Sequence, residues 1–279
     1  MLSLLLSVML AMQAMAVMEV YVPEQPVVAQ HGMEATLNCS FSHNNPFNLS
    51  DMSVFWQLTD TKRSVHGYSG GHDKLVDQVE RFANRTSLFP TQLGLGNASL
   101  LLRRVVVADE GSYTCFVRVQ DYGSAALLLL VAAPYSKPVV TLEPESNLRP
   151  GDEVALHCVA YDGYPEASVI WQDGSGRNLT DNITTSLVAN EEGLFTMTSV
   201  LTVLLEPNST YSCRLINPLL GDEGYAFVTI TENTCRACML FITVAWIILT
   251  PGSNHKLVLP VAEQCHRRVL GVNASLKDN

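Results

Sequence analysis

Apolar and polar residues alternate along several short stretches of the chain. Residues 35–41 carry alanine, leucine, cysteine and phenylalanine at every second position, and the same period of two recurs over 54–58, 113–117 and 154–158. Successive side chains of a β-strand point to opposite faces of its sheet, so this period predicts strands with one buried face. Residues 200–205 form an apolar run that predicts a further strand. The pattern therefore predicts an all-β protein.

One of these stretches carries a diagnostic motif. Residues 108–115 read Ala-Asp-Glu-Gly-Ser-Tyr-Thr-Cys, and Cys39 and Trp56 precede them. In an immunoglobulin sandwich a disulfide joins strands B and F, a tryptophan of strand C packs on it, and a tyrosine two residues before the second cysteine forms the tyrosine corner. Cys39, Trp56, Tyr113 and Cys115 supply these parts, so we expect a Cys39–Cys115 disulfide around a core of Trp56 and Tyr113.

The same motif occurs a second time, as Cys158, Trp171, Tyr211 and Cys213. The first cysteine pair is separated by 76 residues and the second by 55. The longer interval has room for the extra strands of a variable-type (V-type) sandwich, and the shorter one suits a constant-type (C-type) sandwich. We therefore expect two tandem immunoglobulin-like sandwiches, V-type at residues 19–132 and C-type at 138–231.

An ion pair is expected at the lower edge of the first sandwich. Arg85 stands thirty residues before Cys115, where V-type domains carry an arginine that pairs with the aspartate of the tyrosine-corner run, here Asp109. Both positions lie away from the loops, so we interpret the Arg85–Asp109 pair as structural.

Apolar segments lie near both ends of the chain. Residues 1–16 combine a short hydrophobic run with an Ala-Met-Ala end, which is typical of a secretory signal peptide. Residues 237–250 are also apolar, but a helix of that length covers about 21 Å of a hydrocarbon core of about 30 Å. Lys256, Arg267 and Arg268 follow it, as expected of a cytoplasmic side. We expect membrane anchoring through 237–250 with residues 251–279 as a tail; the alternative is a secreted protein.

Seven cysteines and eight Asn-x-Ser/Thr sequons fit the secretory route. Two disulfides leave Cys235, Cys238 and Cys265, for which an interchain disulfide, acylation and free thiols are all open. Seven of the sequons predict N-linked glycans, at Asn38, Asn48, Asn84, Asn97, Asn178, Asn182 and Asn208. Occupancy of the eighth, Asn273, depends on whether the tail is cytoplasmic.

The sequons of the first domain predict which of its faces is free. Asn38 is next to the inward-pointing Cys39 and so points outward from the sheet of strands A, B, E and D. Asn84 and Asn97 fall on the same side, so the opposite sheet is expected to be bare of sugar. The same parity turns Phe55, Gln57, Phe116 and Arg118 outward on that bare sheet.

These residues are the candidate interaction face. Asp121 and Tyr122 adjoin them in the loop before the last strand, and two of the four leucines at 127–130 should be exposed beside them. An exposed apolar patch indicates a protein-binding site. The alternative is that single exposed apolar residues on a sheet are ordinary and contact nothing.

Composition and motifs exclude several other functions. The net charge of −10 without a Lys/Arg cluster argues against nucleic-acid binding. Residues 67–71 match Gly-x-Ser-x-Gly, but a nucleophile elbow needs a strand-to-helix turn on a parallel sheet, which an all-β domain lacks. We interpret these residues as a turn between two strands. The histidines show no metal-ligand spacing, and there is no phosphate-binding loop. We therefore expect no catalysis, no metal or other cofactor and no small-molecule substrate.

Longer runs resemble one family. They include Trp-Gln-Leu-Thr-Asp-Thr-Lys at 56–62, Val-Ala-Asp-Glu-Gly-Ser at 107–112, Ala-Ala-Pro-Tyr-Ser-Lys-Pro at 132–138 and Gly-Tyr-Pro-Glu-Ala at 163–167. Over residues 19–231 the chain resembles the B-seven and butyrophilin family of T-cell co-signalling ligands. The resemblance implies a cell-surface ligand with its V-type domain outermost that binds a receptor on T cells or other leukocytes. It also implies modulation of T-cell activation and cytokine output, in either direction, through the front sheet of the V-type domain.

Two other functions compete with this interpretation. An antigen-receptor chain would carry a Phe/Trp-Gly-x-Gly bulge in its last strand, and this sequence lacks that motif. A homophilic adhesion molecule has the same domain layout, and so has a secreted decoy form of the ligand.

Overall fold

The computed structural model describes residues 18–43, 46–144, 148–233 and 269–276. The chain divides into two compact units between Ala132 and Ala133. The expected signal peptide (residues 1–16), the apolar segment 237–250 and the cysteines at 235, 238 and 265 lie outside the described residues. Across the described ranges, we find no helix with the length and apolar character needed to cross a bilayer.

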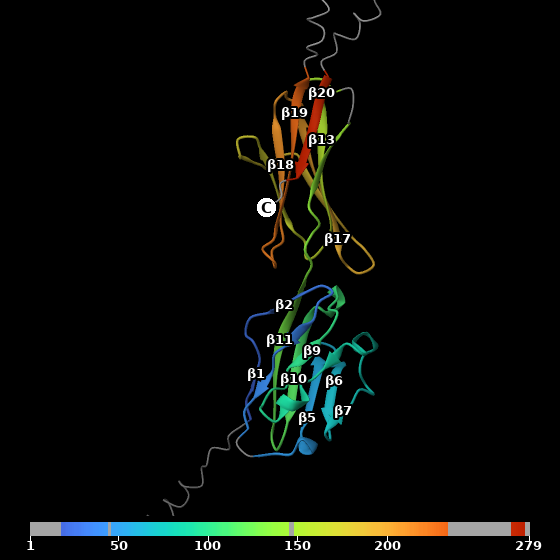
Figure 1. The fold of residues 1–279 in the computed structure, drawn as a ribbon, viewed down its shortest axis with the longest axis vertical. Helices are drawn as coiled ribbons and strands as arrows, with labels where there is room; N and C mark the ends of the chain where they lie inside the picture. The colour runs from blue at the N-terminus through green and yellow to red at the C-terminus, as the bar shows by residue number, and fades with distance from the viewer. Residues whose placement is uncertain (1–17, 44–45, 145–147, 234–268, 277–279) are drawn as a thin grey trace, which may run out of the picture. The chain divides into compact units, whose positions relative to one another are not determined.

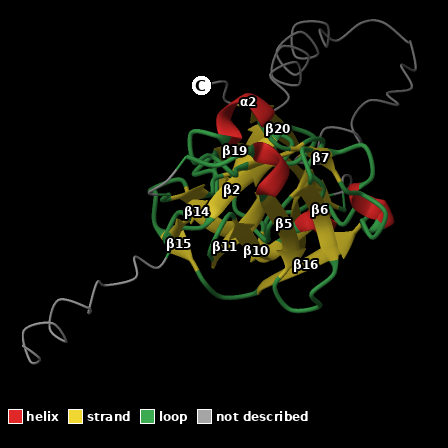
Figure 2. Ribbon diagram, turned by 90° about the horizontal axis from the view of Figure 1, so that it is seen from below, coloured by secondary structure: helices red, strands yellow, loops and turns green. Residues whose placement is uncertain are grey.

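The first unit is built from two facing sheets and a short strand pair (Figure 1). The larger sheet has the order β2-β11-β10-β5-β6-β7, with β2 Val27–Gln30, β11 Tyr122–Ala132, β10 Gly111–Arg118, β5 Ser53–Leu58, β6 Ser64–Ser69 and β7 His72–Asp73. The smaller sheet has the order β3-β9-β8, with β3 Ala35–Leu37, β9 Leu100–Leu102 and β8 Thr86–Ser87. β1 (Val20–Tyr21) pairs with β4 (Ser40–Phe41). Among the described residues of this unit, helix occurs as short turns (Figure 2), of which α2 (Pro90–Leu93) begins with the proline that suits a first helical position.

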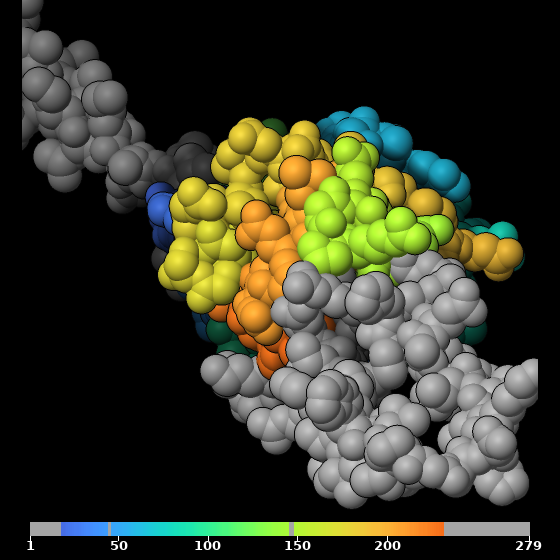
Figure 3. Space-filling view, turned by 90° about the horizontal axis from the view of Figure 1, so that it is seen from above, coloured from blue at the N-terminus to red at the C-terminus, as the bar shows by residue number. Residues whose placement is uncertain are grey.

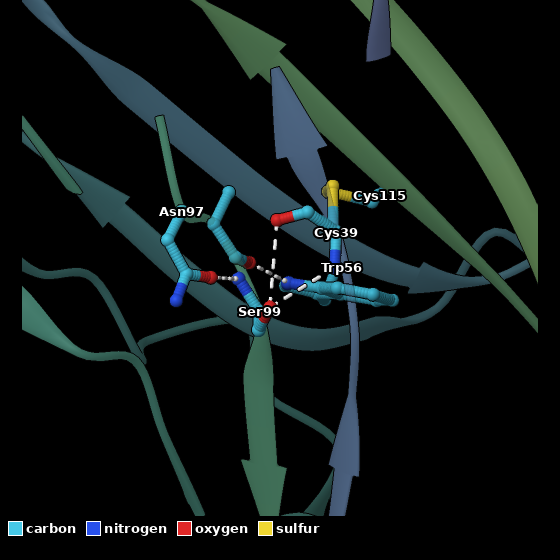
Figure 4. The surroundings of a disulfide bond; sticks show 6 residues. Cys39, Trp56, Asn97, Ser99 and Cys115 are labelled. Atoms are coloured by element: carbon cyan, nitrogen blue, oxygen red, sulfur yellow. Dashed lines mark hydrogen bonds between the residues drawn. A yellow bond between two sulfur atoms is a disulfide. The ribbon is translucent and has the colours of Figure 1, made fainter. Parts of the chain in front are cut away.

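The core of the first unit surrounds a disulfide between Cys39 and Cys115. Trp56 is fully buried beside it, and its indole Nε1 donates a hydrogen bond to the carbonyl of Ala98 at 3.0 Å. Ser99 Oγ accepts a hydrogen bond from the amide of Cys39 at 3.0 Å (Figure 4). In the chain-entropy model a bridge closing a 76-residue loop contributes roughly 4.5 kcal/mol. The disulfide therefore holds the two sheets together while neighbouring polar groups are satisfied.

The second unit is also a sandwich of two antiparallel sheets. One has the order β12-β13-β17-β16, with β12 Val139–Glu143, β13 Glu153–Gly163, β17 Phe195–Leu204 and β16 Ile183–Ala189. The other has the order β15-β14-β18-β19-β20, with β15 Asn178–Leu179, β14 Ser168–Asp173, β18 Thr210–Ile216, β19 Glu223–Asn233 and β20 Val269–Leu276. The two predicted disulfides and the all-β tandem-sandwich fold are thus confirmed.

The core of the second unit repeats the plan with different hydrogen-bond partners. Trp171 is fully buried near the Cys158–Cys213 disulfide, and its Nε1 donates to the hydroxyl of Ser199 at 3.0 Å. Tyr211 is also buried. The buried Asn217 uses Nδ2 to donate to the carbonyls of Ala133 (2.9 Å) and Tyr164 (3.1 Å), which joins the start of this unit to its β13–β14 turn.

Two local features differ from the sequence-based expectation. Residues 67–69, expected in a turn, form the end of β6, and the turn to β7 is Gly70–Gly71. Within the expected tail of residues 251–279, β20 pairs antiparallel with β19 from Asn233↔Val269 to Ala226↔Leu276. Residues 270–276 carry apolar side chains at every second position, a strand signal that was overlooked because these residues were interpreted as a tail.

Candidate functional site

The outward face of the six-stranded sheet brings two phenylalanines into direct register. Phe116 of β10 is the cross-strand partner of Phe55 of β5. Neighbours at this position on one face have Cβ atoms about 4.5–5.5 Å apart, so the two rings form one apolar surface. Phe55 is 39% exposed and Phe116 is half-buried.

Small residues flank the phenylalanine pair on both sides. Phe55 faces Gly67 of β6, and Phe116 faces Ser124 of β11. A Cβ atom added to Gly67 would lie 3.4 Å from the Phe55 ring and 2.7 Å from the carbonyl oxygen of Lys74. The glycine therefore lets the Phe55 ring lie close to the backbone of β6, and it lets the backbone of Lys74, just after β7, approach Gly67.

The apolar surface continues along β11. Tyr122 at the start of the strand is 77% exposed and Leu128 is 41% exposed, while Leu127 and Leu129 are buried. Two exposed leucines were expected here, but Leu130 is only half-buried. The reason is that β2 pairs alongside, with Val28 opposite Leu130.

Polar residues surround this apolar surface. Gln57 is half-buried opposite Thr114, and Arg118 is exposed between Ser53 and Tyr122. Asp121 is exposed in the β10–β11 turn, where its carbonyl accepts a hydrogen bond from the amide of Val119 at 2.9 Å. The structure thus places the six predicted face residues on this sheet or its adjoining turn.

A cluster of hydroxyls on the same sheet was missed by the sequence analysis. Thr59 Oγ1 lies 2.8 Å from Thr114 Oγ1, and Ser112 Oγ donates to Thr59 Oγ1 at 3.0 Å. Thr114 and Ser112 share the parity of Phe116, which is the signal that could have identified them.

We define the front face as Phe55, Gln57, Phe116, Arg118, Asp121, Tyr122 and Leu128.

The Arg85–Asp109 pair lies away from this front face. The Asp109 side chain is fully buried, and both of its carboxylate oxygens accept hydrogen bonds from the Arg85 guanidinium, one from Nη1 at 3.2 Å. Arg85 also donates to three backbone carbonyls, and the Val106 amide donates to Asp109 at 3.0 Å. The Tyr113 hydroxyl donates to the Asp109 carbonyl at 2.6 Å, and burial raises the pKa of Tyr113 far above its ordinary value. These contacts indicate a structural pair.

A buried histidine joins the far edge of the front sheet to the smaller sheet. His66 of β6 is fully buried, with Nδ1 2.9 Å from Thr86 Oγ1 of β8 and Nε2 3.4 Å from Asp73 Oδ1 of β7. Burial lowers the pKa of His66, although the Asp73 carboxylate acts in the opposite direction. The alternation pattern gave no sign of this residue.

The sequon asparagines of the first unit lie outside the strands of the front sheet. Asn38 follows β3, Asn84 precedes β8 and Asn97 precedes β9, so three of them flank the smaller sheet. Asn48 precedes a short 3-10 turn, Leu49–Asp51. Asn38, Asn48 and Asn84 are exposed, whereas Asn97 is half-buried and its Nδ2 donates to Gln92 Oε1.

Comparison with known proteins assigns the chain to a family. Residues 22–126 match the immunoglobulin V-set domain, and residues 136–224 match the immunoglobulin C domain typified by butyrophilin subfamily 3 member A2. A CD276 antigen homolog of Xenopus laevis is 43% identical over 241 residues, covering 86% of this chain and 78% of that protein. This chain belongs to the B-seven and butyrophilin family. The resemblance noted from the sequence is therefore confirmed.

Two further relatives match the chain at lower identity. The mouse V-set domain containing T-cell activation inhibitor 1 is 31% identical, covering 74% of this chain and 71% of that protein. Human butyrophilin subfamily 2 member A2 is 27% identical over 82% of this chain, which spans only 42% of that longer relative. These relatives are immunoglobulin-superfamily proteins, and the chain is not an enzyme.

Solved structures agree with this assignment. Bovine butyrophilin superposes with a TM-score of 0.67 at 27% identity, covering 76% of this chain and 98% of that one. A chain from the complex of ICOS with ICOS-L superposes with a TM-score of 0.65 at 28% identity, covering 74% of this chain and 99% of that one. The likeness to each solved structure covers about three quarters of this chain and therefore includes residues of both units.

Proposed function

We propose that this protein is a ligand on the external side of the plasma membrane that binds a receptor on T cells or other leukocytes through its front face. Binding modulates T-cell activation and cytokine production. The observation that carries the proposal is the in-register Phe55–Phe116 pair, which lies on the outward face of a sheet whose strands hold no sequon. Aromatic residues in the centre of a polar rim are typical of protein-binding surfaces.

Two comparisons support this function. One relative is named as an inhibitor of T-cell activation, and one structural neighbour comes from a complex of ICOS with ICOS-L. Both share the V-type and C-type units with this chain. They support an immune-cell receptor as the partner class, and they leave the direction of the signal to experiment.

The function can be tested on cells that display the full chain. T cells stimulated through their antigen receptor are cultured with these cells, and cytokine release is compared between the wild type and Phe55→Asp. Leu95→Asp is a matched control, because Leu95 is 83% exposed and lies outside the six strands of the front sheet. We expect wild type and Leu95→Asp to change cytokine output equally and Phe55→Asp to lose the effect. Cell aggregation with no effect on T cells would instead support homophilic adhesion.

Display on the membrane is a separate part of the proposal. A single span through residues 237–250 would put the following residues on the cytoplasmic side, whereas the pairing of β20 with β19 makes residues 269–276 part of the second unit. The two arrangements exclude each other in one molecule. Surface retention with a bare Asn273 would support the single-pass type I form. Release into the medium with a glycan on Asn273 would support the secreted decoy form.

A further inference from the structure

A groove lies at the end of the second unit where β14 and β17 stop and β18 begins. It has a volume of about 850 Å³ and is lined by residues from three segments, 173–182, 201–204 and 206–211. Figure 3 looks onto this end, where the yellow residues of the first segment lie beside the orange residues of the last. Its size falls within the range of sites that hold a small organic ligand, roughly 300–1,000 Å³.

All three sequon asparagines between residues 133 and 233 line this groove. Asn178, Asn182 and Asn208 are exposed, and the described contacts include no hydrogen bond from their side-chain amide nitrogens, the atoms that carry N-linked sugar. By contrast, the amide nitrogen of Asn97 in the first unit is already engaged by Gln92.

Backbone contacts fix two of these asparagines against the walls. The carbonyl of Asn182 accepts a hydrogen bond from the amide of Thr202 at 3.0 Å, and the amide of Asn208 donates to the carbonyl of Ile230 at 2.8 Å. Both residues have positive φ, 58° and 60°, which asparagine tolerates better than most residues. Attachment points at Asn182 and Asn208 are therefore held at defined places on the rim.

The lining combines apolar and acidic groups. Leu204 is 61% exposed, and Leu179 and Val203 are half-buried beside it. Asp181 and Glu206 are exposed carboxylates on the same lining. A pyranose ring offers C–H faces to apolar side chains and hydroxyl donors to carboxylates, so this lining matches a sugar.

We propose that the core sugars of N-linked glycans on Asn182 and Asn208 occupy this groove and cover Leu204. Each glycan is attached when the asparagine amide nitrogen loses a proton and bonds to C1 of the first N-acetylglucosamine, displacing the diphosphate of the lipid-linked donor of the secretory pathway. The groove carries three carboxylates, those of Asp173, Asp181 and Glu206, against the single cation of Arg177. This charge disfavours a second copy as the occupant, because like charges would face each other.

The bound sugars have a structural consequence. An exposed leucine at the end of β17, beside an acidic groove, becomes a covered surface, so the glycans act as part of the fold at this end of the unit. This inference requires only passage through the secretory route and does not depend on the proposed receptor.

The test uses the full chain produced in glycosylating cells. Hydroxyl-radical footprinting with mass spectrometry measures oxidation of Leu204, before and after an amidase removes the glycans from the folded protein. Val188 is an internal standard, because it is 66% exposed and does not line the groove. We expect oxidation of Leu204 to rise several-fold relative to Val188 after removal, and to stay low when an endoglycosidase leaves one N-acetylglucosamine on each site.

Variants make the result specific to the groove. Asn182→Gln with Asn208→Gln should reproduce the rise, while Asn48→Gln should not, and circular dichroism checks that each protein is folded. Unchanged oxidation of Leu204 after complete removal would overturn the proposal, and so would bare Asn182 and Asn208 in the secreted protein. Protection that increases with protein concentration and is independent of sugar would show a second copy in the groove instead.

Discussion

Replacing Arg85 with alanine should destabilise the first unit strongly and leave the second unit unaffected. The substitution leaves the carboxylate of Asp109 fully buried with the amide of Val106 as its remaining hydrogen-bond donor. Removing one partner of a buried ion pair costs about 3–5 kcal/mol. For a unit of this size that corresponds to a fall in Tm of roughly 10–30 °C. Arg85→Lys keeps the charge but loses the two-pronged contact, so its loss should be intermediate.

Unfolding of the two units has to be read separately. Pulsed hydrogen-exchange mass spectrometry across a urea series reports β10 and β18 from different peptides. Arg85→Ala should lower the midpoint of β10 alone. Arg214→Ala is the matched control, because the Arg214–Glu223 pair is exposed, with 38% and 49% of the side chains accessible, and exposed pairs contribute little. A change in the free energy of unfolding of β10 below about 1 kcal/mol would refute the assignment of a buried structural pair.

Three further predictions concern single groups. Burial lowers the pKa of His66, so below the ordinary histidine pKa of about 6.5 the unfolded state binds more protons than the folded state. The free energy of unfolding should therefore fall from pH 7 toward pH 5. His66→Gln should reduce this pH dependence in urea titrations. Gly67→Ala should cost about 1–3 kcal/mol and speed hydrogen exchange at the Lys74 amide, since the new Cβ would lie 2.7 Å from the Lys74 carbonyl oxygen; unchanged exchange would contradict this. The hydrogen bond from the Ser175 hydroxyl is the largest cause that lowers the pKa of Asp173 to about 2. This contact should therefore persist at every pH above about 2 and be lost as the pH falls through about 2. NMR titration of Ser175→Ala should show a higher pKa for Asp173.

Local alternation predicted most of the strand faces. Tyr113, Cys115 and Val117 are buried and Arg118 is exposed, because side-chain direction in a strand depends only on position within it. The spacing of cysteines, tryptophans and tyrosines was equally informative, because a disulfide core needs those residues at those separations. These features come from short-range geometry and a known motif.

Pairings between segments that are far apart in the chain could not be predicted from the sequence pattern. The register that sets Phe55 against Phe116 joins strands about sixty residues apart, and the pairing of β2 that half-buries Leu130 joins segments about a hundred residues apart. His66 was missed because its partners, Thr86 and Asp73, come from two other strands. The groove of the second unit was not predicted for the same reason, because three separate segments line it.

The central claim is that the front face binds a receptor on leukocytes. The direct measurement is the affinity of the full chain for activated T cells, by flow cytometry over a concentration series. Wild type is compared with Phe55→Asp, Phe116→Asp and Leu95→Asp, provided that all four proteins have the same Tm. We expect both phenylalanine variants to lose at least about tenfold in affinity, as truncation of a central aromatic does at protein interfaces, while Leu95→Asp binds like wild type. Wild-type affinity in folded phenylalanine variants would contradict the account.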